Sequence, residues 1–332
     1  MAVTMRDIAR GLNVSVVTVS KVLRNKGEIS AATRRRVLQR AKALNYQTNW
    51  VARSLVTRRT YTIGLLLPDF THPFFAEIAR AVAETIRPQN YHLIISYFEE
   101  DPAIEKKEAE SLVARQVDGL MIATAQSRSE MFDAIRKRKV PFVLIDRPLP
   151  KARASFVGAD NEAIGYLATA HLTAQGCRRI AHLRGPEIGI ATARLAGYKR
   201  ALKESGIAPD PGDVVRAGYE DVSGYKAMTQ LLQTTTRPDG VFCYNDPVAI
   251  GAMKAIMEAG FQVPTDIAVV GAGNVRYSDL LAVPLTTVDQ GTQQIGRRAA
   301  ELLLERIESK RQLPLRRMLI APQLVVRRST QR

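Results

Sequence analysis

The spacing of apolar residues changes sharply near residue 60. Before that point, apolar residues recur every three or four positions, which predicts three short helices. Thr4 is placed to cap the first, which passes through Ile8 and Leu12, and Ser15 and Ser30 are placed to cap the other two. Two short helices joined by a tight turn, with a third closing a small core, form a helix-turn-helix.

Beyond Tyr61, short apolar runs alternate with amphipathic stretches of helical period. Apolar strands separated by helices are typical of a parallel sheet that is covered on both faces. Because the runs are too many for one small sheet, we expect an α/β body with two lobes. The predicted strands are residues 62–67, 92–97, 119–123, 142–145, 156–158, 180–183, 241–243 and 267–271.

Two segments of the body resemble each other. Residues 117–122 and 238–243 each place an Asp-Gly pair, at Asp118 and Asp239, directly before a predicted buried strand. The similarity indicates either two copies of one αβ unit or the ordinary preference of Asp-Gly for turns. The sequence leaves both interpretations open.

The positive charge is concentrated at the N-terminus. The net charge is +16, and +11 of it lies in the first 60 residues, which contain thirteen Lys and Arg against Asp7 and Glu28. A segment this basic attracts polyanions, because each neutralised phosphate releases condensed counterions. We expect a nucleic-acid partner for this segment, and the alternative is a solvated basic face.

The composition allows a sizeable core, since 46% of the 332 residues are hydrophobic and 24% are charged. No apolar run approaches the roughly 20 residues of a membrane span, and the first residues lack the pattern of an export signal. Two cysteines, Cys177 and Cys243, are too few for a disulfide framework. We expect a cytoplasmic protein without membrane association.

The sequence shows no motif of an enzyme or a cofactor site. A Gly-x-Ser-x-Gly elbow, a Walker loop and a Cys-x-x-Cys pair are missing, and the four histidines lack metal-ligand spacing. Gly271-Ala272-Gly273 follows a predicted strand as a dinucleotide loop does, but Arg276 stands where the third glycine belongs. We therefore predict neither an enzyme nor a bound cofactor or metal.

Four motifs follow one another along the chain: Asp7-Ile8-Ala9, Val14-Ser15-x-x-Thr18-Val19-Ser20-x-Val22-Leu23, Ala52-Arg53-Ser54-Leu55, and Pro73-Phe74-Phe75-Ala76-Glu77. In this order and spacing, the chain resembles the LacI/GalR family of bacterial transcription regulators over nearly its whole length. The resemblance implies an N-terminal all-α helix-turn-helix domain and an α/β periplasmic-binding-protein-like two-lobed body.

The resemblance also implies domain boundaries. The helix-turn-helix domain is expected at residues 1–46, a hinge helix or linker at 47–60, and the effector-binding and dimerisation domain at 61–332. The bounds expected for the lobes are about 61–160 with 290–320 for lobe 1, and about 161–289 with 321–332 for lobe 2.

The second helix is expected to lie in the DNA major groove. Val16 and Val17 occupy positions that resemble the family's base readers, where valine packs on thymine methyl groups; the alternative is that both are core. Leu55 matches a family leucine that wedges into the minor groove, and the alternative is that it packs on the body. The predicted DNA-binding residues are Thr4, Ser15, Val16, Val17, Thr18, Ser20, Lys21, Asn25, Ala52, Arg53 and Leu55.

The resemblance further implies a small effector held between the lobes. The predicted effector-binding residues are Asp69, Phe74, Phe75, Asp146, Arg147, Ile190, Arg194, Tyr219, Asn245, Gly273 and Gln290. Arginine with aromatic and amide groups suits a polyhydroxylated or anionic ligand. Gly273 stands where the family usually carries an aspartate, so the site is expected to be less acidic, which favours a sugar acid or a phosphorylated compound.

The sequence thus predicts a homodimeric, sequence-specific DNA-binding regulator, a repressor, controlled by a sugar or sugar derivative. Its expected partners are near-palindromic operator DNA, the small-molecule effector and a second copy of the chain. Two other classes of protein fit the sequence less well. A solute-binding transport component has no use for a basic N-terminal segment, and an enzyme needs reactive groups that the sequence does not display.

Overall fold

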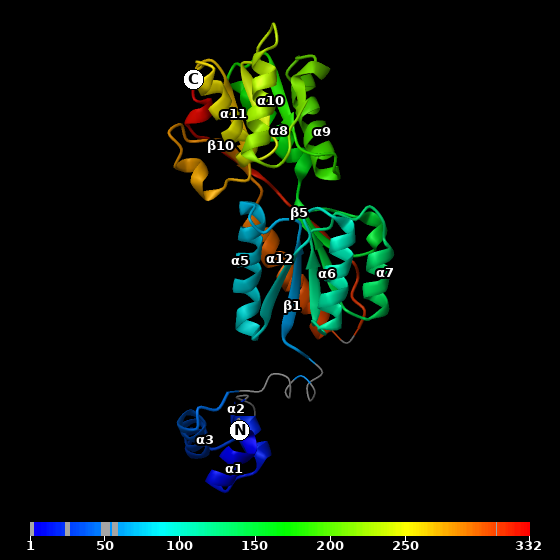
Figure 1. Cartoon of the computed structure of the whole chain (residues 1–332), viewed down its shortest axis with the longest axis vertical. Helices are drawn as coiled ribbons and strands as arrows, with labels where there is room; N and C mark the ends of the chain where they lie inside the picture. Colours follow the sequence, from blue (N-terminus) through cyan, green and yellow to red (C-terminus); the bar gives the residue numbers. More distant parts are fainter. Residues whose placement is uncertain (1–2, 24–26, 48–53, 55–58, 310) are drawn as a thin grey trace. The chain divides into compact units, whose positions relative to one another are not determined.

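The computed structural model describes residues 3–23, 27–47, 54, 59–309 and 311–332. The chain divides into two compact units, Met1–Thr60 and Tyr61–Arg332 (Figure 1). Each unit has its own hydrophobic core, and each is described by itself below.

The N-terminal unit contains the three helices that the sequence predicts: α1 (Met5–Leu12), α2 (Val16–Leu23) and α3 (Ala31–Ala43). Their caps are also as predicted. The Thr4 amide donates to the Asp7 carboxylate at 2.9 Å, and the Ser15 and Ser30 hydroxyls accept amides of their own first turns. The core is formed by buried Ile8, Ala9, Val19, Val22, Val37 and Ala41.

The body contains two six-stranded sheets. The first has the order β11 (Arg317–Ile320), β5 (Ser155–Ala159), β4 (Phe142–Ile145), β3 (Gly119–Ile122), β1 (Thr62–Leu67) and β2 (His92–Tyr97), and all its pairings are parallel. The second has the order β12 (Gln323–Val325), β10 (Thr286–Asp289), β9 (Ala268–Ala272), β8 (Gly240–Cys243), β6 (Ile180–Arg184) and β7 (Val214–Arg216). In this sheet only β12 runs antiparallel to its neighbour.

Helices cover both faces of each sheet (Figure 1). The first sheet has α5 (Pro73–Ile86) and α12 (Thr292–Glu308) on one face, and α6 (Pro102–Ala114) and α7 (Glu130–Lys137) on the other. The second has α8 (Asn161–Ala174) with α9 (Gly189–Glu204), and α10 (Asp221–Leu232) with α11 (Asp246–Glu258). Short 3₁₀ turns occur at Arg87–Gln89, Pro150–Ala152, Pro211–Asp213, Arg276–Asp279 and Arg328–Thr330.

Burial on both faces explains the continuous apolar strands. In β1, Ile63, Leu65 and Leu67 pack in the cluster formed with α5 and α12, whereas Leu66 packs in the cluster formed with α6 and α7. All four side chains are fully buried. A strand that is covered on both sides has no polar face, so the two-residue alternation of a half-exposed strand is missing from the sequence.

The two lobes have the same strand order. This decides between the two interpretations of the similarity between residues 117–122 and 238–243. Each Asp-Gly pair precedes the strand beside the first strand of its lobe. Asp118 accepts the Tyr61 amide at 2.9 Å, just ahead of β1, and Asp239 accepts the Arg179 amide at 2.9 Å, just ahead of β6. The similarity of the two segments therefore reflects two copies of one αβ arrangement.

The chain passes between the lobes three times: after β5, after β10, and between β11 and β12. The helix α12 packs against α5 and the strands β3, β4 and β5, so it belongs to the first lobe although it follows the second in sequence. Several connections between two rigid sheets allow a hinge motion rather than free rotation. Among the described helices, none is long and apolar enough to cross a membrane.

Candidate functional site

The helix α2 presents two valines to solvent. Val16 is 39% exposed and Val17 is 63% exposed, whereas Val19 and Val22 on the same helix are buried in the core. The alternative that Val16 and Val17 belong to the core is therefore wrong. Two adjacent exposed apolar side chains at the start of a helix form a surface suited to thymine methyl groups in a major groove.

The other predicted DNA-binding residues of this unit differ in their surroundings. The hydroxyls of Ser15 and Thr18 lie 2.9 Å apart and Thr4 Oγ1 donates to Asp7, so these polar groups also hold the helix ends. Lys21 is exposed on α2 and Ser20 is partly buried. Four predicted residues lie outside the described residues: Asn25, Ala52, Arg53 and Leu55.

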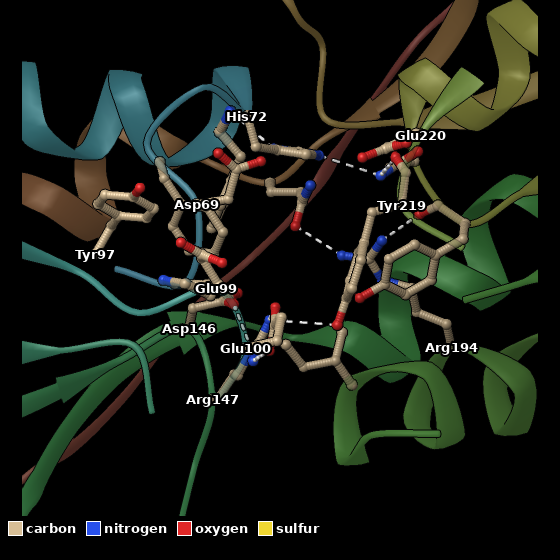
Figure 2. Close-up of a pocket in the computed structure, with 17 residues that line it drawn as sticks. Asp69, His72, Tyr97, Glu99, Glu100, Asp146, Arg147, Arg194, Tyr219 and Glu220 are labelled. Atoms are coloured by element: carbon tan, nitrogen blue, oxygen red, sulfur yellow. Dashed lines mark hydrogen bonds and ion pairs between the residues drawn. The ribbon is translucent and has the colours of Figure 1, made fainter. Parts of the chain in front are cut away.

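A cavity of about 280 Å³ lies at the carboxyl ends of the strands of both lobes (Figure 2). Its walls come from the segments that follow β1, β2, β4, β7, β8 and β10 and from the first turns of α5 and α9. Ligands of open α/β sheets bind at such carboxyl edges. The cavity is lined by Pro68, Asp69, His72, Phe74, Phe75, Tyr97, Glu99, Glu100, Asp146, Arg147, Ile190, Arg194, Tyr219, Glu220, Tyr244, Asn245 and Gln290.

Ten of the eleven predicted effector-binding residues line this cavity, and Gly273 does not. The buried Asp246 accepts the Val275 amide at 2.8 Å and turns the chain after β9. Gly273, with φ of +139°, lies instead on a separate surface pocket with Glu77 and Asn274. The expectation that Gly273 shares the site of Arg194 is therefore corrected.

Seven lining residues were not predicted: Pro68, His72, Tyr97, Glu99, Glu100, Tyr244 and Glu220. Most of them directly follow predicted strands or adjoin predicted site residues. A systematic reading of every strand's carboxyl end would have found Glu99 and Glu100 after β2 and Tyr244 after β8. Glu220 adjoins Tyr219, but it follows β7, which the apolar pattern did not reveal.

Arg194, on α9, is buried and its donors are directed at internal acceptors. Nε donates to Asn161 Oδ1 at 3.0 Å, Nη2 donates to Gln290 Oε1 at 2.7 Å, and Nη1 donates to the Tyr244 carbonyl. The guanidinium carbon lies 4.7 Å from the centre of the Tyr244 ring. Burial lowers the pKa of Arg194 from its ordinary value.

Arg147 forms a two-pronged ion pair with Glu100. Both nitrogen–oxygen distances are 2.5 Å, and Nη2 also lies 3.4 Å from the Tyr219 hydroxyl of the other lobe. Burial is the largest single influence and opposes the charged form, but the hydrogen bonds donated to Glu100 and the electrostatic interactions with Tyr219, Asp146 and Glu100 together outweigh it, so the pKa of Arg147 is raised. Asp146 lies beside it, with 3.7 Å between Asp146 Oδ2 and Arg147 Nε.

Aromatic rings form the apolar part of the walls. Phe74 and Phe75 meet edge to face with ring centres 5.1 Å apart, and Tyr219 and Tyr244 do so at 5.9 Å. The two pairs come from opposite lobes. Ring faces pack on the C–H faces of a small molecule, while nearby amides and carboxylates bind its hydroxyls. Among the described residues, no group of three or more His, Cys, Asp or Glu is arranged to hold a metal.

Comparison with known proteins gives two family matches. Residues 4–49 match the model of bacterial regulatory proteins of the lacI family, and residues 169–330 match that of the periplasmic binding protein-like domain. The ribose operon repressor of Halalkalibacterium halodurans is 37% identical, over 98% of this chain and 97% of its own. The HTH-type transcriptional repressor PurR of Mannheimia succiniciproducens is 34% identical, over 99% of each chain.

Solved structures share the architecture. The Lac repressor dimer bound to operator and the anti-inducer ONPF gives a TM-score of 0.87 at 28% identity, over 99% of each chain. A LacI family regulator from Enterococcus faecium with bound ribose gives 0.73 at 28% identity, over 81% of this chain and 98% of that one. Fold and matches together define a DNA-binding transcriptional regulator with a periplasmic-binding-protein-like body. The chain belongs to the LacI family of bacterial regulatory proteins.

Proposed function

We propose that this protein is a homodimeric transcriptional repressor in the cytoplasm whose affinity for operator DNA is set by a sugar-class effector in the cleft between the lobes. The observation that carries the proposal is that one cavity is walled by side chains of both lobes. A ligand that touches both walls favours one angle between the lobes, because its affinity differs between the open and closed arrangements.

The cleft residues have distinct proposed roles. Phe74, Phe75 and Tyr219 pack on the faces of the sugar ring. Asp69, Asp146 and Asn245 bind its hydroxyl groups, with Ile190 closing one wall. Arg147, Arg194 and Gln290 form the polar floor. The bond from Arg194 to Gln290 and the bond from Arg147 to Glu100 keep these side chains in place before the ligand arrives.

The proposed DNA contacts are those of the N-terminal unit. Val16 and Val17 pack on base methyl groups, while Thr4, Ser15, Thr18, Ser20, Lys21 and Asn25 reach phosphates or base edges. In the linker, Leu55 stays a predicted minor-groove wedge, Ala52 is small enough to allow close approach to the DNA, and Arg53 is predicted to meet phosphate. A symmetric dimer reads two half-sites in opposite orientation, so the operator is expected to be near-palindromic.

Ribose is the first effector to test, since a ribose operon repressor is among the relatives and a neighbouring structure is described with bound ribose. The experiment measures fluorescence anisotropy of labelled DNA from upstream of the protein's own gene, with and without ribose and other neutral sugars. We expect specific, salt-sensitive binding and a change in its Kd with one of these sugars. Equal affinity for upstream and random DNA would exclude the proposed regulator.

A further inference from the structure

The charges that line the effector cavity are unequal. Five carboxylates face two guanidinium groups. The remaining titratable base, His72, adds no positive charge at neutral pH, because burial lowers its pKa to about 4. A cavity with this excess of negative charge attracts cations and repels anions, provided that the guanidinium groups are not available to a ligand.

Neither guanidinium group is available. The donors of Arg194 are directed at Asn161, Gln290 and the Tyr244 carbonyl, so an anion would have to displace bonds within the protein. Arg147 turns its two terminal nitrogens toward Glu100, which occupies the bidentate position that a phosphate or carboxylate would take. Its Nε is buried and has no hydrogen-bond partner among the residues that the structure describes, with the Asp146 carboxylate 3.7 Å away.

Three of the five carboxylates, by contrast, form no ion pair among the described residues. Asp69 accepts the Thr71 amide and hydroxyl, each at 2.7 Å. Within the described part of the chain, Asp69, Glu99 and Glu220 form no ion pair with an arginine, lysine or histidine. The other two, Glu100 and Asp146, are the carboxylates that pair with Arg147. Any ligand that enters the cavity therefore meets free acceptors and no free positive donor.

The backbone holds two of these carboxylates in place. Glu99 and Glu100 directly follow β2, and both adopt left-handed φ angles, +54° and +60°. The Glu99 amide donates to the Pro68 carbonyl at 3.1 Å, which ties this turn to the segment after β1. Two consecutive non-glycine residues in this region cost conformational energy, and such strain is typical of functional segments.

We propose that the cleft selects an uncharged polyhydroxylated ligand and rejects its anionic derivatives, with Glu100 and Glu99 as the specificity-determining residues. This inference rests on the proposed function, since it concerns the charge of that effector. It replaces the expectation of a sugar acid or phosphorylated compound, which came from the glycine at position 273. Glu100 disfavours anionic ligands, because it occupies the guanidinium group of Arg147 that an anion would bind.

The test compares ribose with ribose 5-phosphate by isothermal titration calorimetry on the full-length protein. The wild type is expected to bind ribose at least tenfold more tightly than its phosphate. The variants Glu100→Gln and Glu99→Gln/Glu100→Gln free Arg147 and reduce the repulsion, so their affinity for ribose 5-phosphate should rise at least tenfold. Glu84→Gln, an exposed carboxylate on α5 outside the cavity, is the matched control and should change neither value.

Either of two results overturns the inference: wild-type protein that binds the phosphate as tightly as ribose, or a well-folded double variant that gains no affinity for the phosphate. Thermal unfolding of each variant shows whether it is folded. Failure of the proposed function is distinguishable, because then no neutral sugar binds or changes DNA affinity. The gain of phosphate binding by the double variant still decides the charge selection in that case.

Discussion

His72 and Asn245 meet across the cleft, with 3.2 Å between His72 Nε2 and Asn245 Nδ2. Each is the N-cap of a helix in its own lobe: His72 begins α5 and Asn245 begins α11. The same Asn245 amide donates to the Tyr219 carbonyl at 2.8 Å. The contact therefore joins two helix N-termini from opposite lobes across the cavity.

Replacing Arg194 by alanine should abolish the response to effector while leaving operator binding intact. The buried acceptors on Asn161, Gln290 and Tyr244 lose their donor, so the free energy of unfolding should also fall, by roughly 1–3 kcal/mol. Anisotropy titrations with effector and urea unfolding measure the two effects. Arg200→Ala on the same helix is the control, because its ion pair with Glu162 is about half exposed and contributes little.

The helix α2 carries two exposed valines, Val16 and Val17, and two buried ones, Val19 and Val22. Substitutions in the two pairs should therefore separate an effect on DNA affinity from an effect on the free energy of unfolding. Val17→Ala should weaken specific operator binding by roughly 1–2 kcal/mol and leave the melting temperature unchanged, since this side chain is 63% exposed. Val19→Ala removes buried methyl groups and should destabilise the unit by about 2 kcal/mol. Fluorescence anisotropy measures the operator affinity of both variants, and thermal unfolding measures their stability. A destabilised Val17→Ala protein with normal specificity would contradict the assignment.

The apolar pattern was a good guide to most central strands and to the edge strand β2, but not to the polar strand β10 or the edge strand β7. The strand β10 contains Thr286 and Thr287, which are fully buried only because their hydroxyls bond the Arg327 carbonyl at 2.9 Å and Asp246 at 2.5 Å. Those partners come from distant parts of the chain. The edge strand β7 has three half-buried or exposed residues and so carries no apolar run.

In the effector site, too, the residues that a short segment identifies were predicted, and those whose role depends on distant parts of the chain were not. Phe74 was predicted because it lies within a quoted family motif, and Arg194 because its position in the chain resembles that of a ligand-binding arginine of the family. Glu100 was missed because its role depends on sheet order: β2 and β4 are not neighbours, yet the ends of both reach Arg147. Gly273 was wrongly included because correspondence of sequence position does not reveal where the chain turns after β9.

Leu55→Ala should weaken operator binding more than binding to random DNA. A leucine wedge contributes only where the base step is unstacked and the duplex is bent, which occurs in the specific complex. Competition titrations with both DNAs, at two salt concentrations, measure this. The variant should keep the steep dependence of log K on log salt, because its basic residues are unchanged. Equal losses on both DNAs would contradict the wedge role.

The buried Glu105 of α6 should make the stability of the body depend on pH. Burial raises its pKa to about 7, although the amide of Ala125 donates to Oε2 at 2.9 Å. The folded state thus retains a proton that the unfolded chain, with a pKa near 4.5, releases. Between these two values the unfolded state binds fewer protons, so the free energy of unfolding falls as pH rises, by a total on the order of 3 kcal/mol.

Urea unfolding from pH 4.5 to pH 8.5 checks this, with Glu105→Gln as the test variant and Glu110→Gln, exposed on the same helix, as the control. Glutamine cannot ionise, so the fall between pH 4.5 and pH 7 should shrink in Glu105→Gln and persist in the control. Above pH 7 the curve contributed by this group should flatten, because both states are then ionised. A Glu105→Gln profile identical in slope to that of the wild type would show that another group carries the dependence.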